Sequence, residues 1–192
     1  MLLRLWWTLA SGLAKPRLDP LDECRVALRV WPNDLDSNLH MNHSRYLLAM
    51  DVGRWDYGLR SGVMQKALRK GWFPVVGSET LGFRRPLEPL QRFELATRVV
   101  GWDEKWWWFE QSFEVAGKVH AVGRVKALFR ARQANVPPKA LLAAIGRADV
   151  PSPPLPETIR LWQQAEEAER RHSASGQRAA AERALAEPAA RK

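Results

Sequence analysis

The chain has 192 residues, enough for one domain with extensions, and its 46% hydrophobic content suffices for a core. Its single cysteine, Cys24, excludes an internal disulfide framework and a cysteine-rich zinc site, and it favours a reducing, intracellular compartment. The formal net charge of +9 predicts an anionic partner or substrate. Nucleic acid, an anionic membrane surface and the phosphates of coenzyme A all fit that charge.

Residues 1–22 are predicted to form an amphipathic segment followed by a linker. One helical face of Met1–Ala14 collects Leu2, Leu5, Trp6, Leu9 and Leu13. At ~1.5 Å per residue this segment is too short to cross the ~30 Å core of a bilayer, and it is also short for a signal peptide. Two alternatives remain open: a helix lying in a membrane interface, or a helix docked on the domain or on a partner subunit. The linker, Lys15–Asp22, contains Pro16 and Pro20.

Residues 23–147 are predicted to form the folded domain. A strand over Cys24–Trp31 ends at Pro32, and Asn42 is a suitable N-cap for a helix over His43–Arg60. That helix is apolar almost all round, which predicts burial. A sheet wrapped around one central helix would bury it. The apolar positions of this helix are Tyr46, Leu47, Leu48, Met50, Val52, Trp55, Tyr57 and Leu59.

Four strands are predicted to follow the helix. Turns at Gly101 with Asp103, and at Gly117, separate the last three of them. Residues 148–156 are a proline-rich linker, and residues 157–192, rich in Ala, Glu and Arg, form a helical or disordered arm. The predicted strands are Phe73–Arg84, Arg92–Val100, Lys105–Val115 and Val119–Arg132.

The segment between the first strand and the helix carries the chemistry. Asp36, Asn38 and His40 fall within five residues. A carboxylate can act as a base or nucleophile, an imidazole can transfer a proton, and an amide can orient a water or a carbonyl. The start of a helix adds unpaired backbone N–H groups. This combination predicts a loop for acyl transfer or hydrolysis, where a carbonyl oxygen becomes negative.

These residues resemble the signature of hotdog-fold thioesterases. The Asp-Leu-Asp-x-Asn-x-His-x-Asn run at 34–42 is similar to the active-site loop of plant acyl-ACP thioesterases. The wider Asp-x-x-x-His-x-Asn-x-x-x-Tyr pattern is similar to the superfamily of 4-hydroxybenzoyl-CoA thioesterase. Gly101-Trp102-Asp103-Glu104-Lys105, followed by an aromatic strand, resembles the group of thioesterase superfamily member six. The resemblance covers roughly Cys24–Arg132.

The resemblance implies an α+β hotdog fold and a hydrolase acting on acyl-CoA or acyl carrier protein without a cofactor. It also implies active sites between subunits, hence a homodimer or a higher homo-oligomer. We expect a cytoplasmic protein with a possible peripheral membrane contact through residues 1–14. The alternative is a non-catalytic acyl-binding or membrane-associated hotdog module. Nucleic-acid binding rests on charge and aromatic content alone and is not expected.

The resemblance assigns Asp36 as the nucleophile or base, with Asn38 and His40 assisting. The alternatives are that Asp36 caps the loop and that His40 is structural. A metal cluster of Asp36, His40 and His43 matches no zinc motif, so no metal is expected. Backbone N–H groups near Met41–Ser44 are expected to polarise the carbonyl.

A second set of residues is expected around the substrate. Asn42 should cap the helix, His43 should be structural, and Tyr46 should pack the helix on the sheet. Arg84 and Arg85 could hold the phosphates of coenzyme A or an acidic carrier protein, or could lie on a solvated sheet face. The substrate-binding set is therefore Asn42, His43, Tyr46, Arg84 and Arg85.

Glu79 is a possible second carboxylate. Alternation places it on the face of its strand that carries Val75, Gly77, Leu81 and Phe83, where a carboxylate needs a partner or a function. Asp51 lies in the apolar helix, and Arg54 at i+3 is its expected salt-bridge partner.

Overall fold

The computed structural model describes residues 15–186, with side chains to residue 173. The chain divides into two compact units between Pro154 and Leu155. The second unit contains the helix α5, Glu157–Ala186. The predicted amphipathic segment Met1–Ala14 lies outside the described residues.

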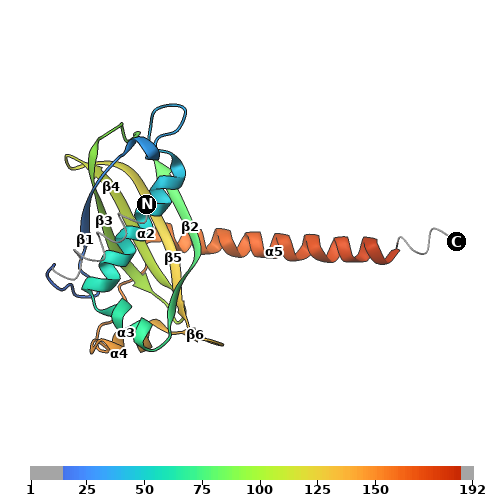
Figure 1. Cartoon of the computed structure of the whole chain (residues 1–192). Helices are drawn as coiled ribbons and strands as arrows, with labels where there is room; N and C mark the ends of the chain where they lie inside the picture. Colours follow the sequence, from blue (N-terminus) through green and yellow to red (C-terminus); the bar gives the residue numbers. More distant parts are fainter. Residues whose placement is uncertain (1–14, 187–192) are drawn as a thin grey trace. The chain divides into compact units, whose positions relative to one another are not determined.

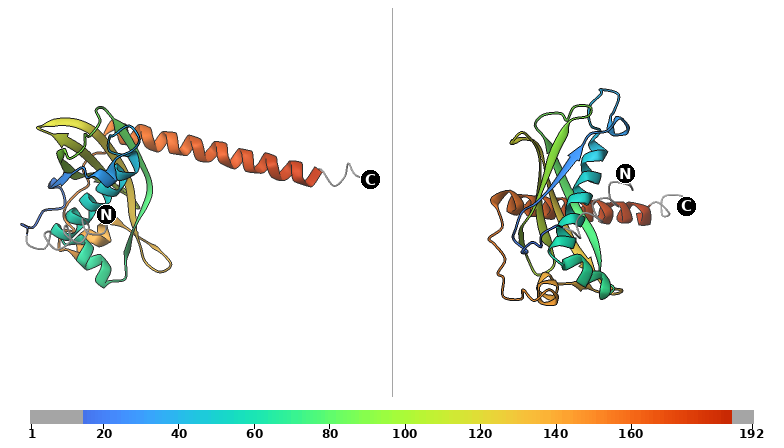
Figure 2. Two further views of the ribbon diagram at one scale, coloured as in Figure 1. Left: turned by 45° about the horizontal axis from the view of Figure 1, so that its top comes forward. Right: turned by 60° about the vertical axis from the view of Figure 1, so that its left-hand side comes forward.

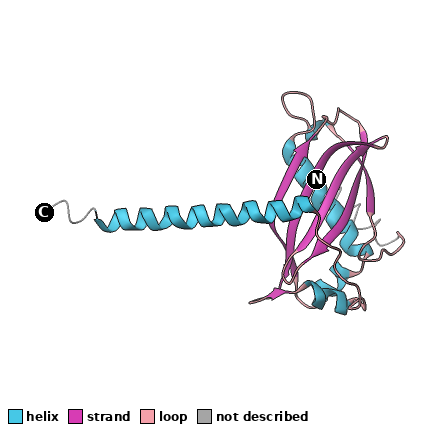
Figure 3. Ribbon diagram, turned by 180° about the vertical axis from the view of Figure 1, so that it is seen from behind, coloured by secondary structure: helices cyan, strands magenta, loops and turns pink. Residues whose placement is uncertain are grey.

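The first unit is a curled antiparallel sheet with α2 on one face (Figures 1 and 2). Seen from behind, the strands cover that helix (Figure 3). The strand order is β1-β3-β4-β5-β2, and a short β6 pairs with β5. This confirms the predicted α+β class and the sheet around one long helix. The elements of this unit are β1 (Cys24–Arg29), the 3-10 turn η1 (Pro32–Asp34), α2 (His43–Arg60), α3 (Val63–Arg69), β2 (Phe73–Phe83), β3 (Arg92–Trp102), β4 (Trp107–Val115), β5 (Lys118–Arg130), β6 (Asn135–Val136) and α4 (Pro138–Ala144).

Helix α2 begins and ends where the sequence predicts. The Oδ1 atom of Asn42 accepts a hydrogen bond from the N–H of Ser44 at 2.9 Å, which makes Asn42 the N-cap. The prediction of burial all round is wrong in part. The side towards the sheet is buried, whereas Leu48 and Trp55 are half-exposed, because the sheet covers only one side of the helix.

Gly53 sets how closely α2 approaches the sheet. A Cβ atom at Gly53 would lie 2.5 Å from Oγ1 of Thr97, so only glycine fits there. The amide of Gln111 bridges the two layers, since its Nε2 donates to Oγ1 of Thr97 at 2.8 Å and to the carbonyl of Met50 at 3.0 Å. These contacts satisfy polar groups buried between helix and sheet.

Two β-bulges correct the predicted strand faces and turns. The register of β2 against β5 shifts between Val76 and Ser78, so Glu79 shares a face with Val76, not with Val75 and Gly77. Gly101 lies at a second bulge inside β3, which continues to Trp102. The turn into β4 depends instead on Asp103, whose Oδ1 accepts from the N–H groups at positions 105 and 106. The predicted hairpin at Gly117 is confirmed by its φ of +74°.

Candidate active site

Asp36 organises the loop that precedes α2. Its Oδ1 accepts from the N–H of Asn38 at 2.8 Å and from the N–H of His40 at 3.4 Å, while its own N–H donates to the carbonyl of His40. Leu39 turns the chain with a φ of +58°. These bonds give Asp36 the loop-capping role that the sequence suggests as the alternative to catalysis. It occupies one oxygen only, and no hydrogen-bond donor within residues 15–186 contacts Oδ2 of Asp36.

The side chains of Asn38 and His40 take different surroundings. Asn38 is exposed, and its backbone N–H makes the bond to Asp36. The half-buried His40 ring has Nε2 3.6 Å from Oε1 of Glu88. Sequence reasoning missed Glu88, because it lies far along the chain in the loop between β2 and β3, and no local pattern marks it. The loop thus places the imidazole of His40 beside the carboxylate of Glu88.

The start of α2 contains one unused donor. The N–H of Met41 donates to the carbonyl of Leu87, and that of Asn42 donates to the carbonyl of Asp34. The N–H groups of Ser44 and Arg45 both donate to Asn42, the first to its Oδ1 atom and the second to its carbonyl. The N–H of His43 alone in this run donates to no acceptor within residues 15–186. A free N–H at a helix N-terminus attracts developing negative charge. The structure therefore singles out one amide where the sequence predicts only a region.

Tyr46 fixes the start of α2 to the sheet. Its side chain is 2% exposed, and its ring centroid lies 5.0 Å from that of Phe83 and 4.9 Å from that of Phe113. Burial raises the pKa of the Tyr46 phenol, and the nearby charge of Asp36 raises it further. The expected packing role of Tyr46 matches these contacts, and His43 is exposed at the first turn.

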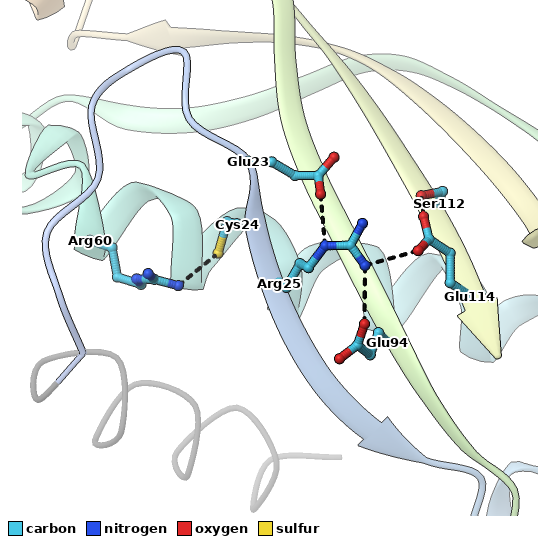
Figure 4. Close-up of polar contacts among 7 residues, drawn as sticks. All are labelled: Glu23, Cys24, Arg25, Arg60, Glu94, Ser112 and Glu114. Atoms are coloured by element: carbon cyan, nitrogen blue, oxygen red, sulfur yellow. Dashed lines mark hydrogen bonds and ion pairs between the residues drawn. The ribbon is translucent and has the colours of Figure 1, made fainter. Parts of the chain in front are cut away.

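Arg84 and Arg85 follow the end of β2. Both backbone N–H groups donate to the carbonyl of His120, and both side chains are exposed. Neither contacts Asp36, Asn38 or His40. Arg84 lines a polar hollow of about 320 Å³ on the sheet face opposite α2. That face carries ion pairs such as those of Arg25, whose guanidinium contacts Glu23, Glu94 and Glu114 (Figure 4).

An apolar cavity of about 550 Å³ lies between the second half of α2 and the sheet. Asp36, Asn38 and His40 do not line it. A cavity of this size and character suits an acyl chain. Asp51 and Arg54 form part of its wall, and its main apolar lining is Leu48, Val52, Trp55, Val63, Met64, Val76, Trp107, Phe109, Ala127 and Phe129.

A charged group borders this cavity. The predicted ion pair of Asp51 and Arg54 is confirmed. Arg54 also donates from Nη1 to Oε1 of Gln111 at 2.8 Å and lies 4.0 Å from Oε2 of Glu79. Glu79 therefore has the partner that its position requires. Burial raises the pKa of the Glu79 carboxyl, Asp51 adds to the rise, and Arg54 opposes it.

The raised pKa of Glu79 gives a pH-dependent prediction. The Glu79 carboxyl binds its proton more tightly in the folded than in the unfolded protein. It therefore lowers the stability of the fold as the pH rises from the ordinary pKa of a glutamate through the raised pKa of Glu79. Glu79→Gln should therefore unfold at a higher temperature than wild type at pH 7, and the gain should disappear at pH 4. Thermal unfolding at both pH values measures this. A variant less stable than wild type at pH 7 would mean that the ion pair with Arg54 outweighs the burial of the carboxylate.

Two further properties concern metals and membranes. Within residues 15–186, no three His, Cys, Asp or Glu side chains gather closely enough to hold a metal ion. Of the helices in the same range, none combines the length and the apolar character that a membrane crossing requires.

Comparison with known proteins agrees with this architecture. Residues 30–163 match the model of the thioesterase-like superfamily. Protein THEM6 of Danio rerio is 34% identical over 160 residues, which cover 82% of this chain and 77% of that protein. The probable thioesterase YbaW of Escherichia coli superposes with a TM-score of 0.60 at 18% identity, covering 65% of this chain and 98% of that one. The gentisyl-coenzyme A thioesterase BH1999 superposes with a TM-score of 0.55 at 20% identity, covering 64% and 98%.

The structural neighbours confirm the expected hotdog fold. The match of the superfamily model spans most of the chain, and the relative from Danio rerio supports the predicted group. The chain belongs to the thioesterase-like superfamily.

Proposed function

We propose that this chain hydrolyses the thioester of an acyl-coenzyme A to a free acid and a thiol. Thioester hydrolysis is the chemistry of the superfamily to which the chain belongs. The observation that supports Asp36 as its centre is the pairing of two unused groups on one short segment. These are Oδ2 of Asp36 and the backbone N–H of His43.

The proposed mechanism uses these groups in turn. Oδ2 of Asp36 removes a proton from water, and the resulting hydroxide adds to the thioester carbon, so that the carbonyl oxygen becomes negative. Alternatively, Oδ2 itself adds to that carbon, and water later hydrolyses the acyl-aspartate anhydride to release the acid. The N–H of His43 donates to this oxyanion, and one such donor lowers the barrier by roughly 3 kcal/mol. The C–S bond then breaks, and the thiolate takes a proton from the imidazole of His40, whose Nε2 lies 3.6 Å from Oε1 of Glu88. Asn38 orients the water, while Arg84 and Arg85 bind phosphates of the carrier.

The acyl chain occupies the apolar cavity, which supports a site built from two subunits. Leu48, the first residue of α2 on the cavity wall, lies five residues beyond His43, so about 7.5 Å of helix separates the cavity from the loop within one chain. Asp36, Asn38 and His40 do not line the cavity of their own chain. We therefore infer that the cavity meets the loop of another copy.

Strand β2 supports a symmetric pair of chains. It is an edge strand, and it exposes Val76 by 43% and Phe83 by 53%. Exposed apolar edges of this kind invite pairing with another strand. The start of β2 lines the cavity, and Phe83 at its end packs on Tyr46 beside the loop. Two copies of β2 paired antiparallel about a two-fold axis would bring the cavity of one subunit to the Asp36 loop of the other.

Thiol release tests the reaction and the shared site together. Acyl-coenzyme A substrates of several chain lengths, and the same acyl groups on acyl carrier protein, are given to wild type and to two inactive variants. Asp36→Asn removes the carboxylate, and Ala127→Trp fills the cavity. When the two variants are mixed in equal amounts and exchange subunits, half of the dimers contain one subunit of each variant. Each mixed dimer has one intact site out of two, so the mixture should show about a quarter of the wild-type rate.

Three outcomes would oppose the proposal. A mixture as inactive as its parts, while exchange is proven by native mass measurement, would place loop and cavity in one chain. Faster release from carrier protein at every chain length would exclude coenzyme A as the preferred carrier. Acyl-coenzyme A binding by wild type without any thiol release would favour the non-catalytic acyl-binding module.

A further inference from the structure

One end of the first unit is rich in exposed cations. It consists of α3, the start of β2, the end of β5, β6 and α4, which gather at the foot of the sheet in Figure 1. Neither residues 65–78 nor residues 125–148 contain an Asp or Glu. We call this region the basic end, and its exposed cations are Lys66, Arg69, Lys70, Arg130, Arg132 and Lys139.

Large apolar side chains lie among these cations. Leu68 is 41% exposed, and Phe73 is 59% exposed, directly opposite Arg130 in the pairing of β2 with β5. A groove of about 690 Å³ runs beside them, and its lining includes Lys70, Phe73, Val75, Arg130 and Arg132. Within residues 15–186, neither Arg130 nor Arg132 has an ion-pair partner. A surface that alternates free cations with exposed apolar groups is typical of a binding face.

The N-terminal part of the chain reaches the structure at the same end. Nζ of Lys15 lies 2.9 Å from Oδ1 of Asp56, and the N–H of Leu18 donates to the carbonyl of Arg60 at the end of α2. Helix α3 begins three residues beyond Arg60. The segment that precedes Lys15 is the one whose sequence collects leucines and Trp6 on one helical face. The described part of the chain therefore begins beside the basic end.

We propose that the basic end binds the surface of an anionic membrane. Cations near such a surface are attracted to its headgroups, and side chains such as Phe73 and Leu68 enter the boundary between headgroups and acyl chains. A nucleic acid or a soluble acidic chain would match the charge but would leave those two side chains in water. Val75 lines both the groove and the apolar cavity, so this orientation presents the cavity to acyl groups held in the bilayer.

Vesicle co-sedimentation of the full chain tests this proposal without reference to hydrolysis. Vesicles of phosphatidylcholine alone are compared with vesicles containing phosphatidylserine, at low and high salt. Wild type should prefer the anionic vesicles. The triple variant Lys70→Gln, Arg130→Gln, Arg132→Gln should bind them about 100-fold more weakly, since each cation contributes about fivefold. The double variant Leu68→Ser, Phe73→Ser should also bind more weakly.

The matched controls lie at the other end of the sheet. Lys118 is exposed at the opposite end of β5 from Arg130, and Leu90 is an exposed leucine in the loop between β2 and β3. Lys118→Gln and Leu90→Ser should bind as wild type does, and all variants should keep the wild-type melting temperature. Undiminished binding by the triple variant would overturn the proposal. Undiminished binding by the double variant, or equal displacement by a soluble polyanion, would overturn it as well.

Discussion

Asp36→Asn is expected to lower kcat/KM for thioester hydrolysis by about 10²- to 10⁴-fold, the range typical of a lost general base. Asparagine keeps an oxygen at the Oδ1 position, which accepts from the N–H groups of Asn38 and His40, so the loop should persist. Only the negative charge and the second acceptor oxygen are lost. Thiol release under kcat/KM conditions measures the effect, and circular dichroism with a melting curve checks the fold.

Asp103 provides a control with similar bonding to the backbone. Its Oδ1 accepts from the N–H groups of Lys105 at 2.8 Å and Trp106 at 2.7 Å, in a turn outside the proposed site, and its Oδ2 accepts from Nε1 of Trp108 at 3.2 Å. Asp103→Asn should leave kcat/KM close to that of wild type. If Asp36→Asn were as active as Asp103→Asn, the carboxylate would only cap its loop, and the catalytic assignment would be wrong.

The fold was predictable where the decisive signals are local. The N-cap at Asn42 is next to the helix it starts, and strand alternation reflects one buried face. The bulge in β2 was not predictable, because it depends on a distant contact. A Cβ atom at Gly77 would lie 2.5 Å from Cζ3 of Trp106. Strand β2 therefore bulges at the point where the indole of Trp106 packs against its backbone. This shift moves Glu79 to the face of Val76, whereas simple alternation pairs it with Val75.

The candidate site divides in the same way. Asp36, Asn38 and His40 are contiguous, so sequence alone could propose their loop. Glu88 approaches His40 from another loop, and no spacing rule connects the two. The unused N–H of His43 depends on which neighbouring amides find acceptors elsewhere in the fold. The cavity needs residues from two helices and three strands, and only the assembled sheet shows it.

Asp56 is the clearest residue that sequence reasoning missed. It lies in the same apolar helix as Asp51, and the helical pattern alone does not show which of the two faces the core. Asp56 is fully buried, whereas Asp51 is exposed. Its carboxylate accepts from Sγ of Cys24 at 2.9 Å and lies 2.9 Å from Nζ of Lys15. Nη1 of Arg60 is 3.6 Å away and also approaches the sulfur (Figure 4).

This cluster joins three parts of the chain through one charge. Lys15 comes from the N-terminal linker, Cys24 from β1, and Arg60 from the end of α2. Burial raises the pKa of the Cys24 thiol to about 12, and its hydrogen bond to Asp56 contributes. The thiol therefore stays protonated at neutral pH and acts as a donor. Without the carboxylate, the Cys24 thiol and Nζ of Lys15 would lose the acceptor that they share, and Arg60 would lose its ion pair.

Asp56→Ala should consequently lower the free energy of unfolding by about 3–5 kcal/mol, the cost of breaking a buried ion pair by removing one partner. Urea denaturation at pH 7 measures it. Glu94→Ala is the matched control, because Glu94 also pairs with an arginine, at 3.0 Å from Arg25, but is exposed on the sheet face (Figure 4). It should change stability by less than about 1 kcal/mol. Equal losses in the two variants would show that burial adds nothing to the Asp56 cluster.

The double variant Lys15→Ala, Asp56→Ala tests whether the two side chains interact. Removing both partners leaves fewer charges unpaired, so the double variant should lose less free energy of unfolding than the sum of the losses of the two single variants. A loss greater than that sum would contradict a shared interaction.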